Sequence, residues 1–301
     1  MHYVGLDIGG TTIKAGLIDE TGRVLESRKA PTAVDDLNGF LSKLAELIRG
    51  FQKSVSIDGA GIGVPGLHSA KSHTIVTSPN IPCLTNVNLE ERLADQVHIR
   101  VVTENDANAG AYAEFVCGEA AGVRHMAYLT LGTGLGSGFV LNGSLYTGAS
   151  GYGGEFGHTL LVPEGRLCGC GRRGCVETMI SATGMVRTAK EKGLTESDTE
   201  PLTAETIFQA AIEGNPVAQE VFEETGRYLG MACANLINLL NLEMIVISGG
   251  VMASGDVLIR AARDVASLES FAASYADCQI VQSQLWPDAG MIGAALLARD
   301  R

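Results

Sequence analysis

Three cysteines and a histidine stand close together in the middle of the chain. The segment CGCGRRGC (168–175) contains Cys168, Cys170 and Cys175, and GGEFGH ends at His158. One histidine and three cysteines are the donor set of a Cys3His zinc site. Four protein ligands leave no open position for a reacting water, so such a site would be structural. A reduced, metal-free thiol cluster is the alternative.

Two carboxylates flank this cluster. Glu155 is three residues before His158, and Glu177 is two residues after Cys175. A metal ion bound to one imidazole nitrogen fixes the direction and tautomer of the other. We therefore expect a zinc ion to hold both carboxylates near one place and to shape a substrate pocket.

Turns rich in glycine and threonine are a second kind of candidate site. DIGGTT (7–12), LGTGLGSG (131–138) and SGGV (248–251) each include or follow the end of an apolar strand pattern. Backbone N–H groups that converge in such turns bind phosphate, and glycine lets the ligand come close. We expect the first two turns to hold one nucleotide and the third to adjoin its adenosine. The sequence has no Walker P-loop motif.

A further glycine motif, GIGVPG (61–66), satisfies G-x-G-x-x-G. The residues that follow do not have a helical pattern, and no ribose-binding acid closes a βαβ unit. This motif therefore does not predict a Rossmann dinucleotide site.

Two aspartates stand at the predicted ends of strands. Asp7 follows YVGL and faces the first glycine turn, where an oxygen ligand suits Mg²⁺. Asp106 stands where the strand IRVVTEN meets a helix. Aspartate is a preferred N-cap, but active sites of α/β proteins also collect at such strand ends. Position alone leaves both roles open for Asp106, and Asn105 beside it could bind a polyol.

The elements that position these residues follow a repeated pattern. Residues 3–27 and 127–150 each read as a strand, a Gly/Thr turn, a second strand, a polar turn and a third strand. This repetition predicts two similar α/β halves. Helical periodicity dominates after the cysteine cluster, and a last helix closes the chain. The polar stretch 192–203 is predicted to be a solvated linker.

Composition restricts the class of protein. The chain has 301 residues, of which 46% are hydrophobic and 19% charged, enough for two domains or one large one. The net charge of −12 disfavours sequence-independent binding of nucleic acid. The first residues lack the pattern of a signal peptide. The apolar stretch 234–253 is interrupted by asparagines and Glu243, which argues against a membrane span.

The cysteine usage fits a reducing compartment. The chain has seven cysteines, and four of them stand singly: Cys83, Cys117, Cys233 and Cys278. Single cysteines are most often small buried hydrophobic residues, whereas clustered cysteines in such a compartment favour metal over disulfide. We expect a cytoplasmic protein.

The order of the motifs resembles that of a known family. DIGGTTIKAG, GIGVPG, SPN, ENDAN, LGTGLGSG, GGEFGH, CGCGRRGCVE and SGGV follow one another as in the ROK family of bacterial sugar kinases and related repressors. The resemblance runs from Asp7 to the GAALLA helix. It implies an α/β actin-like ATPase fold of the hexokinase type, with two RNase H-like domains around a cleft. The expected domains are 1–106 plus 288–301 (small, N-terminal) and 107–287 (large, with the zinc-binding loop).

The resemblance also implies a role for each motif residue. Asp106 would be the general base that accepts the proton of the sugar's 6-hydroxyl. The expected sugar-binding residues are Gly66, Asn80, Asn105, Asp106, Glu155, His158 and Glu177. The expected nucleotide-binding residues are Asp7, Gly9, Gly10, Thr11, Thr12, Lys14, Gly132, Thr133, Gly134, Gly249 and Gly250. His158, Cys168, Cys170 and Cys175 would bind structural Zn²⁺, and Asp7 would organise Mg²⁺.

The implied activity is that of an ATP-dependent sugar kinase of carbohydrate metabolism, with ATP, Mg²⁺ and Zn²⁺ as cofactors. Glucose is the first expected substrate, and a homodimer or dimer of dimers is the expected assembly. N-acetylglucosamine, N-acetylmannosamine and other hexoses are the alternatives, because the wall at 78–89, near the sugar's 2-position, does not reveal whether an acetamide fits. A non-catalytic sugar sensor or repressor is less expected, since DIGG begins at Asp7 and the family's repressors carry a preceding DNA-binding domain.

Overall fold

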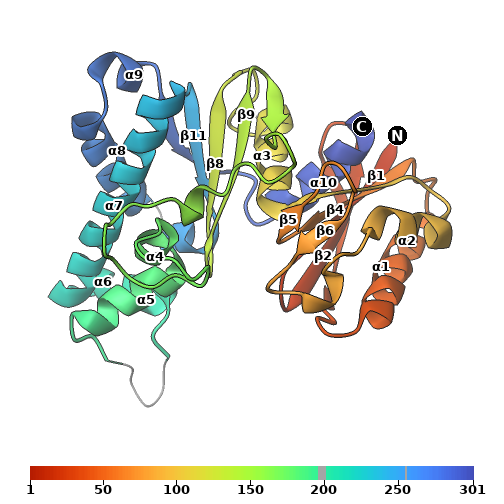
Figure 1. The fold of residues 1–301 in the computed structure, drawn as a ribbon, viewed down its shortest axis with the longest axis horizontal. Coiled ribbons are helices and arrows are strands. Elements are labelled where there is room, and N and C mark those ends of the chain that lie inside the picture. The colour runs from red at the N-terminus through yellow and green to blue at the C-terminus, as the bar shows by residue number, and fades with distance from the viewer. Residues whose placement is uncertain (196–200, 255) are drawn as a thin grey trace. The chain divides into compact units, whose positions relative to one another are not determined.

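The computed structural model describes residues 1–195, 201–254 and 256–301 (Figure 1). The predicted linker at 192–203 includes residues 196–200, which lie outside the described residues. The strands are β1 His2–Ile8, β2 Thr12–Asp19, β3 Val24–Pro31, β4 Gly59–Val64, β5 Leu67–His68, β6 Ile75–Thr77, β7 Val101–Asn105, β8 Met126–Leu131, β9 Leu135–Leu141, β10 Ser144–Tyr146, β11 Met244–Ser248 and β12 Gln279–Gln282.

The helices connect and cover these strands. They are α1 Leu37–Gln52, α2 Leu89–Val97, α3 Asp106–Cys117, α4 Glu177–Ile180, α5 Ala182–Glu191, α6 Ala204–Ile212, α7 Pro216–Leu240, α8 Asp256–Glu269, α9 Ala272–Ala276 and α10 Ala289–Asp300, with short 3-10 helices at Pro82–Leu84, Phe156–His158 and Gly250–Ser254. No helix among the described residues is long and apolar enough to cross a bilayer. The stretch 234–253 is divided mainly between α7 and β11.

Two sheets repeat the same strand order. One runs β3-β2-β1-β4-β7 and the other β10-β9-β8-β11-β12. In each, an antiparallel hairpin meander is followed by two parallel strands. The predicted polar turn before β10 places Asn142 and Gly143 at positive φ, as a tight hairpin turn requires. The predicted repeat of an α/β pattern is therefore confirmed.

Sequence patterns explain the helices that cover the first sheet. In α1 the apolar residues Phe40, Leu44, Leu47, Ile48 and Phe51 recur at helical spacing, and all are buried. The helix α2 begins because the side chain of Asn88 accepts the backbone N–H of Glu91. These apolar faces join the strands in one continuous core.

The last helix packs directly on the strands of the first sheet. A Cβ atom at Gly5 of β1 would lie 1.9 Å from the carbonyl oxygen of Met291, and one at Gly61 of β4 would lie 1.7 Å from that of Ala294. Both strands need glycine there because the backbone of α10 passes so close. Glycine in the interior of a strand normally weakens the strand. The close approach of α10 explains why glycine is present at these two positions.

Contacts divide the chain into two compact units. Unit 1 comprises residues 1–122, 138–154 and 285–301, and unit 2 comprises 123–137 and 155–284. The limits expected from the sequence were 106/107 and 287/288. The two divisions differ at 107–122, 138–154 and 285–287, and the domain limits stay a prediction. The last helix, α10, belongs to unit 1.

Candidate functional site

In unit 1, Asp7 lies at the end of β1 against the beginning of α10. A Cβ atom at Gly290 would lie only 2.9 Å from the carboxyl carbon of Asp7. The pKa of Asp7 is raised, mainly by burial. The charge of Lys14 lowers this pKa, and the charge of Asp288 raises it. Sequence reasoning missed Asp288, although it directly precedes the closing helix. A pair of nearby carboxylates offers the oxygen donors that Mg²⁺ prefers, so these residues fit that ion.

The first glycine turn joins β1 to β2 and is exposed. The N–H of Gly9 donates to the carbonyl of Thr12 at 2.9 Å, and the Thr32 hydroxyl donates to the Gly9 carbonyl at 2.8 Å. The residues Gly9, Gly10, Thr11 and Thr12 are accessible from solvent. Lys14 follows in β2, where its Nζ donates to the carbonyl of Pro287 at 2.7 Å. The turn has the accessible backbone that a phosphate site needs.

The junction of β7 and α3 distinguishes Asn105 from Asp106. The N-cap of α3 is Asn105, whose Oδ1 accepts the N–H groups of Ala107 and Asn108 at 2.9 and 3.1 Å. The N-cap role considered for Asp106 is therefore wrong. Asp106 is the first helical residue, and its Oδ1 accepts the N–H of Ala107 at 3.0 Å. A neighbouring residue provides the cap, so capping does not explain why an aspartate stands there.

Several predicted sugar-binding residues gather at this end of the first sheet. The side-chain amide of Asn105 donates to the carbonyl of Gly66 at 3.2 Å. Gly66 has φ +132°, and a Cβ there would lie 2.2 Å from the carbonyl oxygen of Thr77. A Cβ on Gly10 would lie 3.7 Å from the Cβ of Asn80. The fold thus brings Gly66 to Asn105, and Asn80 to the first glycine turn.

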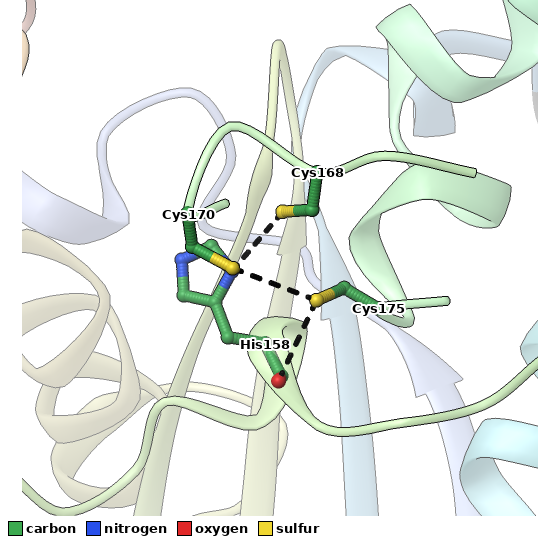
Figure 2. Close-up of side chains that lie close together, drawn as sticks. All are labelled: His158, Cys168, Cys170 and Cys175. Atoms are coloured by element: carbon green, nitrogen blue, oxygen red, sulfur yellow. Dashed lines mark hydrogen bonds between the residues drawn. The ribbon is translucent and has the colours of Figure 1, made fainter. Parts of the chain in front are cut away.

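Unit 2 holds the cysteine cluster, and its four side chains converge as predicted (Figure 2). Their ligand atoms all lie within 4.8 Å of one another. The Sγ of Cys168 is 3.6 Å from Nδ1 of His158, and the Sγ atoms of Cys170 and Cys175 are 3.7 Å apart. A metal ion bound here would therefore meet Nδ1 of His158.

The cysteine loop folds back on itself to bring these ligands together. The N–H of Cys168 donates to the carbonyl of Arg172 at 2.8 Å, and Leu161 donates to Gly174 at 2.8 Å. Gly171 and Gly174 have positive φ, which a side chain would disfavour. Gly169 does not have positive φ, and a Cβ there would meet open space. Glycine is thus required at Gly171 and Gly174, and the structure gives no such reason for Gly169.

The electrostatics of the cluster suit a metal ion. The backbone N–H of Arg172 lowers the pKa of Cys170 to about 6, whereas burial raises the pKa of Cys168 to about 12. The backbone thus favours the thiolate form of Cys170, and a bound cation would favour ionisation of the other thiols. The donor set and its spacing fit Zn²⁺.

Both predicted carboxylates lie at this cluster. Glu177 begins α4, and its Oε1 is 3.5 Å from the Sγ of Cys168. Its Oε2 accepts the N–H of Leu135 at 2.9 Å, a contact that the sequence did not reveal. The pKa of Glu155 is raised, mainly by burial. The charge of Glu177 also raises this pKa, and His158 lowers it. His158, Glu155 and Glu177 therefore lie within electrostatic reach of one another, as expected for a shaped site.

The second glycine turn, between β8 and β9, is tied to the same region. A Cβ at Gly134 would lie 2.3 Å from Oε2 of Glu177. The N–H of Ala182 donates to the carbonyl of Gly132 at 2.8 Å, and the Thr183 hydroxyl donates to that of Thr133 at 2.6 Å. The beginning of α5 thus holds this turn, whose exposed residue is Thr133.

The third glycine turn follows β11, which pairs with β8. Gly249 has φ +99°, and a Cβ there would lie 2.3 Å from the carbonyl oxygen of Leu131. A Cβ at Gly250 would meet no atom within 4 Å. The third turn therefore adjoins Leu131, the last residue of β8 and the first of the segment 131–138.

Each unit thus contains part of the predicted site. Unit 1 contains Asp7, Gly9, Gly10, Thr11, Thr12, Lys14, Gly66, Asn80, Asn105 and Asp106. Unit 2 contains Gly132, Thr133, Gly134, Glu155, His158, Cys168, Cys170, Cys175, Glu177, Gly249 and Gly250. Unit 1 has carboxylates at strand ends, and unit 2 has a metal-type cluster beside glycine turns.

Comparison with known proteins covers the whole chain. The sequence profile of the ROK family matches residues 3–301. A glucokinase from Halalkalibacterium halodurans is 36% identical over 320 residues, which cover 99% of this chain and 95% of the relative. An N-acetylmannosamine kinase from Citrobacter koseri is 33% identical over 303 residues, covering 99% of each chain.

A solved structure agrees with these sequence matches. The ROK family glucokinase from Streptomyces griseus, in complex with glucose and AMPPNP, is 33% identical, covers 100% of both chains and has a TM-score of 0.87. The repeated strand order and the ordered motifs fit this similarity. The chain therefore belongs to the ROK family and has the actin-like ATPase fold of its sugar kinases.

Proposed function

We propose that this protein is an ATP-dependent hexose kinase that transfers phosphate to the 6-hydroxyl of glucose. The observation that carries the proposal is the junction of β7 and α3, which places the carboxyl group of Asp106 directly after the carboxyl end of a strand, beside Asn105 and Gly66. The similarity to two sugar kinases over 99% of the chain supports the reaction class. The glucokinase with bound glucose and AMPPNP supports the choice of glucose and ATP.

In this proposal Asp106 is the general base. Its carboxylate accepts the proton of the 6-hydroxyl as that oxygen attacks the γ-phosphorus of ATP, and ADP leaves. A positioned base contributes about 10²–10⁴-fold to such a step. Most of the remaining acceleration in phosphoryl transfer comes from positioning and charge neutralisation. The hydrogen bonds of Asn105 to Gly66 and to α3 support a rigid setting for this base.

The other sugar hydroxyls are assigned to Gly66, Asn80, Asn105, Glu155, His158 and Glu177. Nδ1 of His158 faces the sulfur of Cys168, so Nε2 is the nitrogen assigned to the sugar. The raised pKa of Glu155 supports a role as a partner of hydroxyl groups, because burial has left this carboxyl poorly solvated.

The nucleotide is assigned to the glycine turns. Gly9, Gly10, Thr11, Thr12 and Lys14 would bind phosphate from the first turn, and Gly132, Thr133 and Gly134 from the second. Gly249 and Gly250 would adjoin the adenosine. Asp7, with Asp288 nearby, would hold Mg²⁺, which when bound neutralises charge on the phosphates. Zn²⁺ at His158, Cys168, Cys170 and Cys175 would be structural and would fix the orientation of His158.

An N-acetylhexosamine kinase is the second candidate. The observation that favours it is the 33% identity to an N-acetylmannosamine kinase over 99% of both chains. The two candidates share the chemistry and differ in the group at the sugar's 2-position. A cytoplasmic location and a homodimer or dimer of dimers remain part of the proposal.

The test is ADP release from Mg-ATP with glucose, mannose, fructose, allose, N-acetylglucosamine and N-acetylmannosamine, and with no sugar as the control. We expect the highest kcat/KM with glucose and product phosphorylated at the 6-position. A higher kcat/KM with an acetylated sugar would replace glucose by the second candidate. No turnover with any sugar by zinc-loaded protein would refute the kinase proposal.

A further inference from the structure

Glu104 contacts the turn between β7 and α3 that carries Asp106. The resemblance to the ROK motif ENDAN assigned no role to Glu104. The side chain of Glu104 is buried, with 6% of the residue exposed. Its Oε1 accepts the backbone N–H of Asn105 at 2.9 Å and the side-chain amide of Asn108 at 3.0 Å. These donors stand on the two sides of Asp106 in the sequence, so one carboxylate oxygen spans the turn.

The second oxygen of Glu104 has a partner from a distant part of the sequence. The guanidinium of Arg301 donates to Oε2 of Glu104 at 2.6 Å. A buried carboxylate without partners is strongly destabilising, whereas a paired and hydrogen-bonded one is tolerated. Both oxygens of Glu104 are satisfied, so the side chain is fixed in one orientation.

The contacts of Glu104 continue to groups assigned to the sugar. Glu104 holds the backbone of Asn105, and the side chain of Asn105 in turn donates to the carbonyl of Gly66. The Oδ1 of Asn105 fixes the first turn of α3, where Asp106 begins the helix. A change at Glu104 would therefore reach Asp106 and Asn105 together, through two hydrogen bonds.

We propose that Glu104 is a positioning residue for Asp106, and that Arg301 is the counter-ion that stabilises Glu104 in the folded protein. The inference rests on the proposed kinase activity. Loss of a partner that orients a metal ligand typically costs about 10–100-fold in activity, and a misplacement of about 1 Å in a reacting group can cost about 10²-fold; we expect an effect of the same order here. Glu104 would thus act on kcat without touching the substrate.

Glu90 provides a matched control. Its Oε1 accepts the backbone N–H and the hydroxyl of Thr103 at 2.7 and 3.0 Å. Both glutamates therefore brace β7 through backbone N–H groups, but Glu90 does so two residues earlier, and among the described residues it makes no such contact with Asn105. A general loosening of β7 would affect both variants, whereas loss of positioning would affect Glu104 alone.

The experiment measures kcat, KM for sugar and ATP, and Tm for Glu104→Ala, Glu104→Gln, Arg301→Ala and Glu90→Ala, with the sugar that the wild type prefers. We expect Glu104→Ala to lower kcat about 10–100-fold with little change in the KM for ATP. Glu104→Gln should restore most of kcat, because its amide oxygen can accept both N–H groups. Arg301→Ala should lower Tm, and Glu90→Ala, which removes the acceptor of the Thr103 N–H, should keep kcat within about twofold.

The outcomes separate this inference from the proposed function. A wild type active on a sugar, with Glu104→Ala keeping kcat within about twofold, would overturn the positioning role. Equal losses of kcat in Glu104→Ala, Glu90→Ala and Arg301→Ala would overturn it too, since they would indicate a structural effect. A wild type inactive on every sugar would overturn the kinase proposal and this inference with it.

Discussion

The two sheets have the same strand order but carry different side chains at matching places. In β1, Asp7 stands two residues before the first glycine of its turn, and in β8 the matching residue is Thr130. The edge strand β7 leads into Asn105 and Asp106, whereas the matching strand β12 leads into Ser283. The backbone pattern has been repeated, and the carboxylates assigned to Mg²⁺ and proton transfer have not.

The difference indicates that the two sheets have different roles in the proposed site. The first sheet ends in acidic groups that could act on reacting atoms. The second sheet ends in glycine turns, and Glu177 ties one of them to the cysteine cluster. If the comparison is right, changes in the first sheet should remove chemistry, and changes in the second should disturb metal content, stability and binding.

The largest expected effect is that of Asp106→Asn. We expect kcat to fall about 10²–10⁴-fold, because the amide cannot accept the hydroxyl proton, while the Tm and the KM for ATP change little. Measurement of ADP release checks this, with the exposed Asp95→Asn as the control. If the Asp106→Asn protein kept a tenth of the wild-type rate, Asp106 would not be the general base, and the chemical role of the first sheet would be refuted.

The next effect is loss of the metal cluster in unit 2. We expect Cys170→Ser to lose bound zinc and to lower the Tm by more than about 5 °C, because a structural site contributes to folding. Mass spectrometry of native protein and thermal unfolding measure both quantities. Cys83→Ser, which changes a cysteine outside the cluster, should retain one zinc ion per chain. Zinc-free wild-type protein of unchanged Tm would contradict the structural role.

The third effect distinguishes two neighbouring glycines of unit 2. Gly249→Ala should lower the free energy of unfolding by about 2 kcal/mol or more, because its positive φ and the carbonyl of Leu131 leave no room for a Cβ. Gly250→Ala should change it by no more than about 0.5 kcal/mol, because a Cβ there meets open space. Urea unfolding measures both, and equal losses would show that this turn is not fixed by Leu131.

The smallest effect concerns the buried carboxyl of Glu155 and depends on pH. Since burial raises its pKa in the folded protein, its ionisation costs stability once the pH exceeds its ordinary value. Below that value the carboxyl is protonated in both states, and the cost vanishes. Glu155→Gln should therefore unfold at a higher temperature than the wild type at pH 7, and this difference should shrink toward pH 4.

The exposed Glu223→Gln is the control for that measurement. Its Tm difference from the wild type should stay nearly constant over the same range. The Glu155→Gln enzyme should also bind sugar more weakly, because an amide replaces a charged acceptor. A Tm difference for Glu155→Gln that does not depend on pH would show that this carboxyl is well solvated.

Much of the fold and the site follows from residues near one another in the sequence. The hairpins, the glycine turns and the loop of Cys168, Cys170 and Cys175 depend on hydrogen bonds and φ preferences within a few residues, so their patterns were readable. The same locality explains one error. Asp106 matched the N-cap preference, but the neighbouring Asn105 satisfied the helix N–H groups instead.

The sequence by itself determined the repeated α/β pattern, the ligand set of the metal-type cluster and the family. Only the tertiary structure decided that Asp288 lies within electrostatic reach of Asp7, that Arg301 pairs with Glu104 and that Glu177 accepts the N–H of Leu135. These contacts join residues 42 to 281 positions apart. Such pairs leave no periodic or local signal, because packing of α10 and the strand order bring them together.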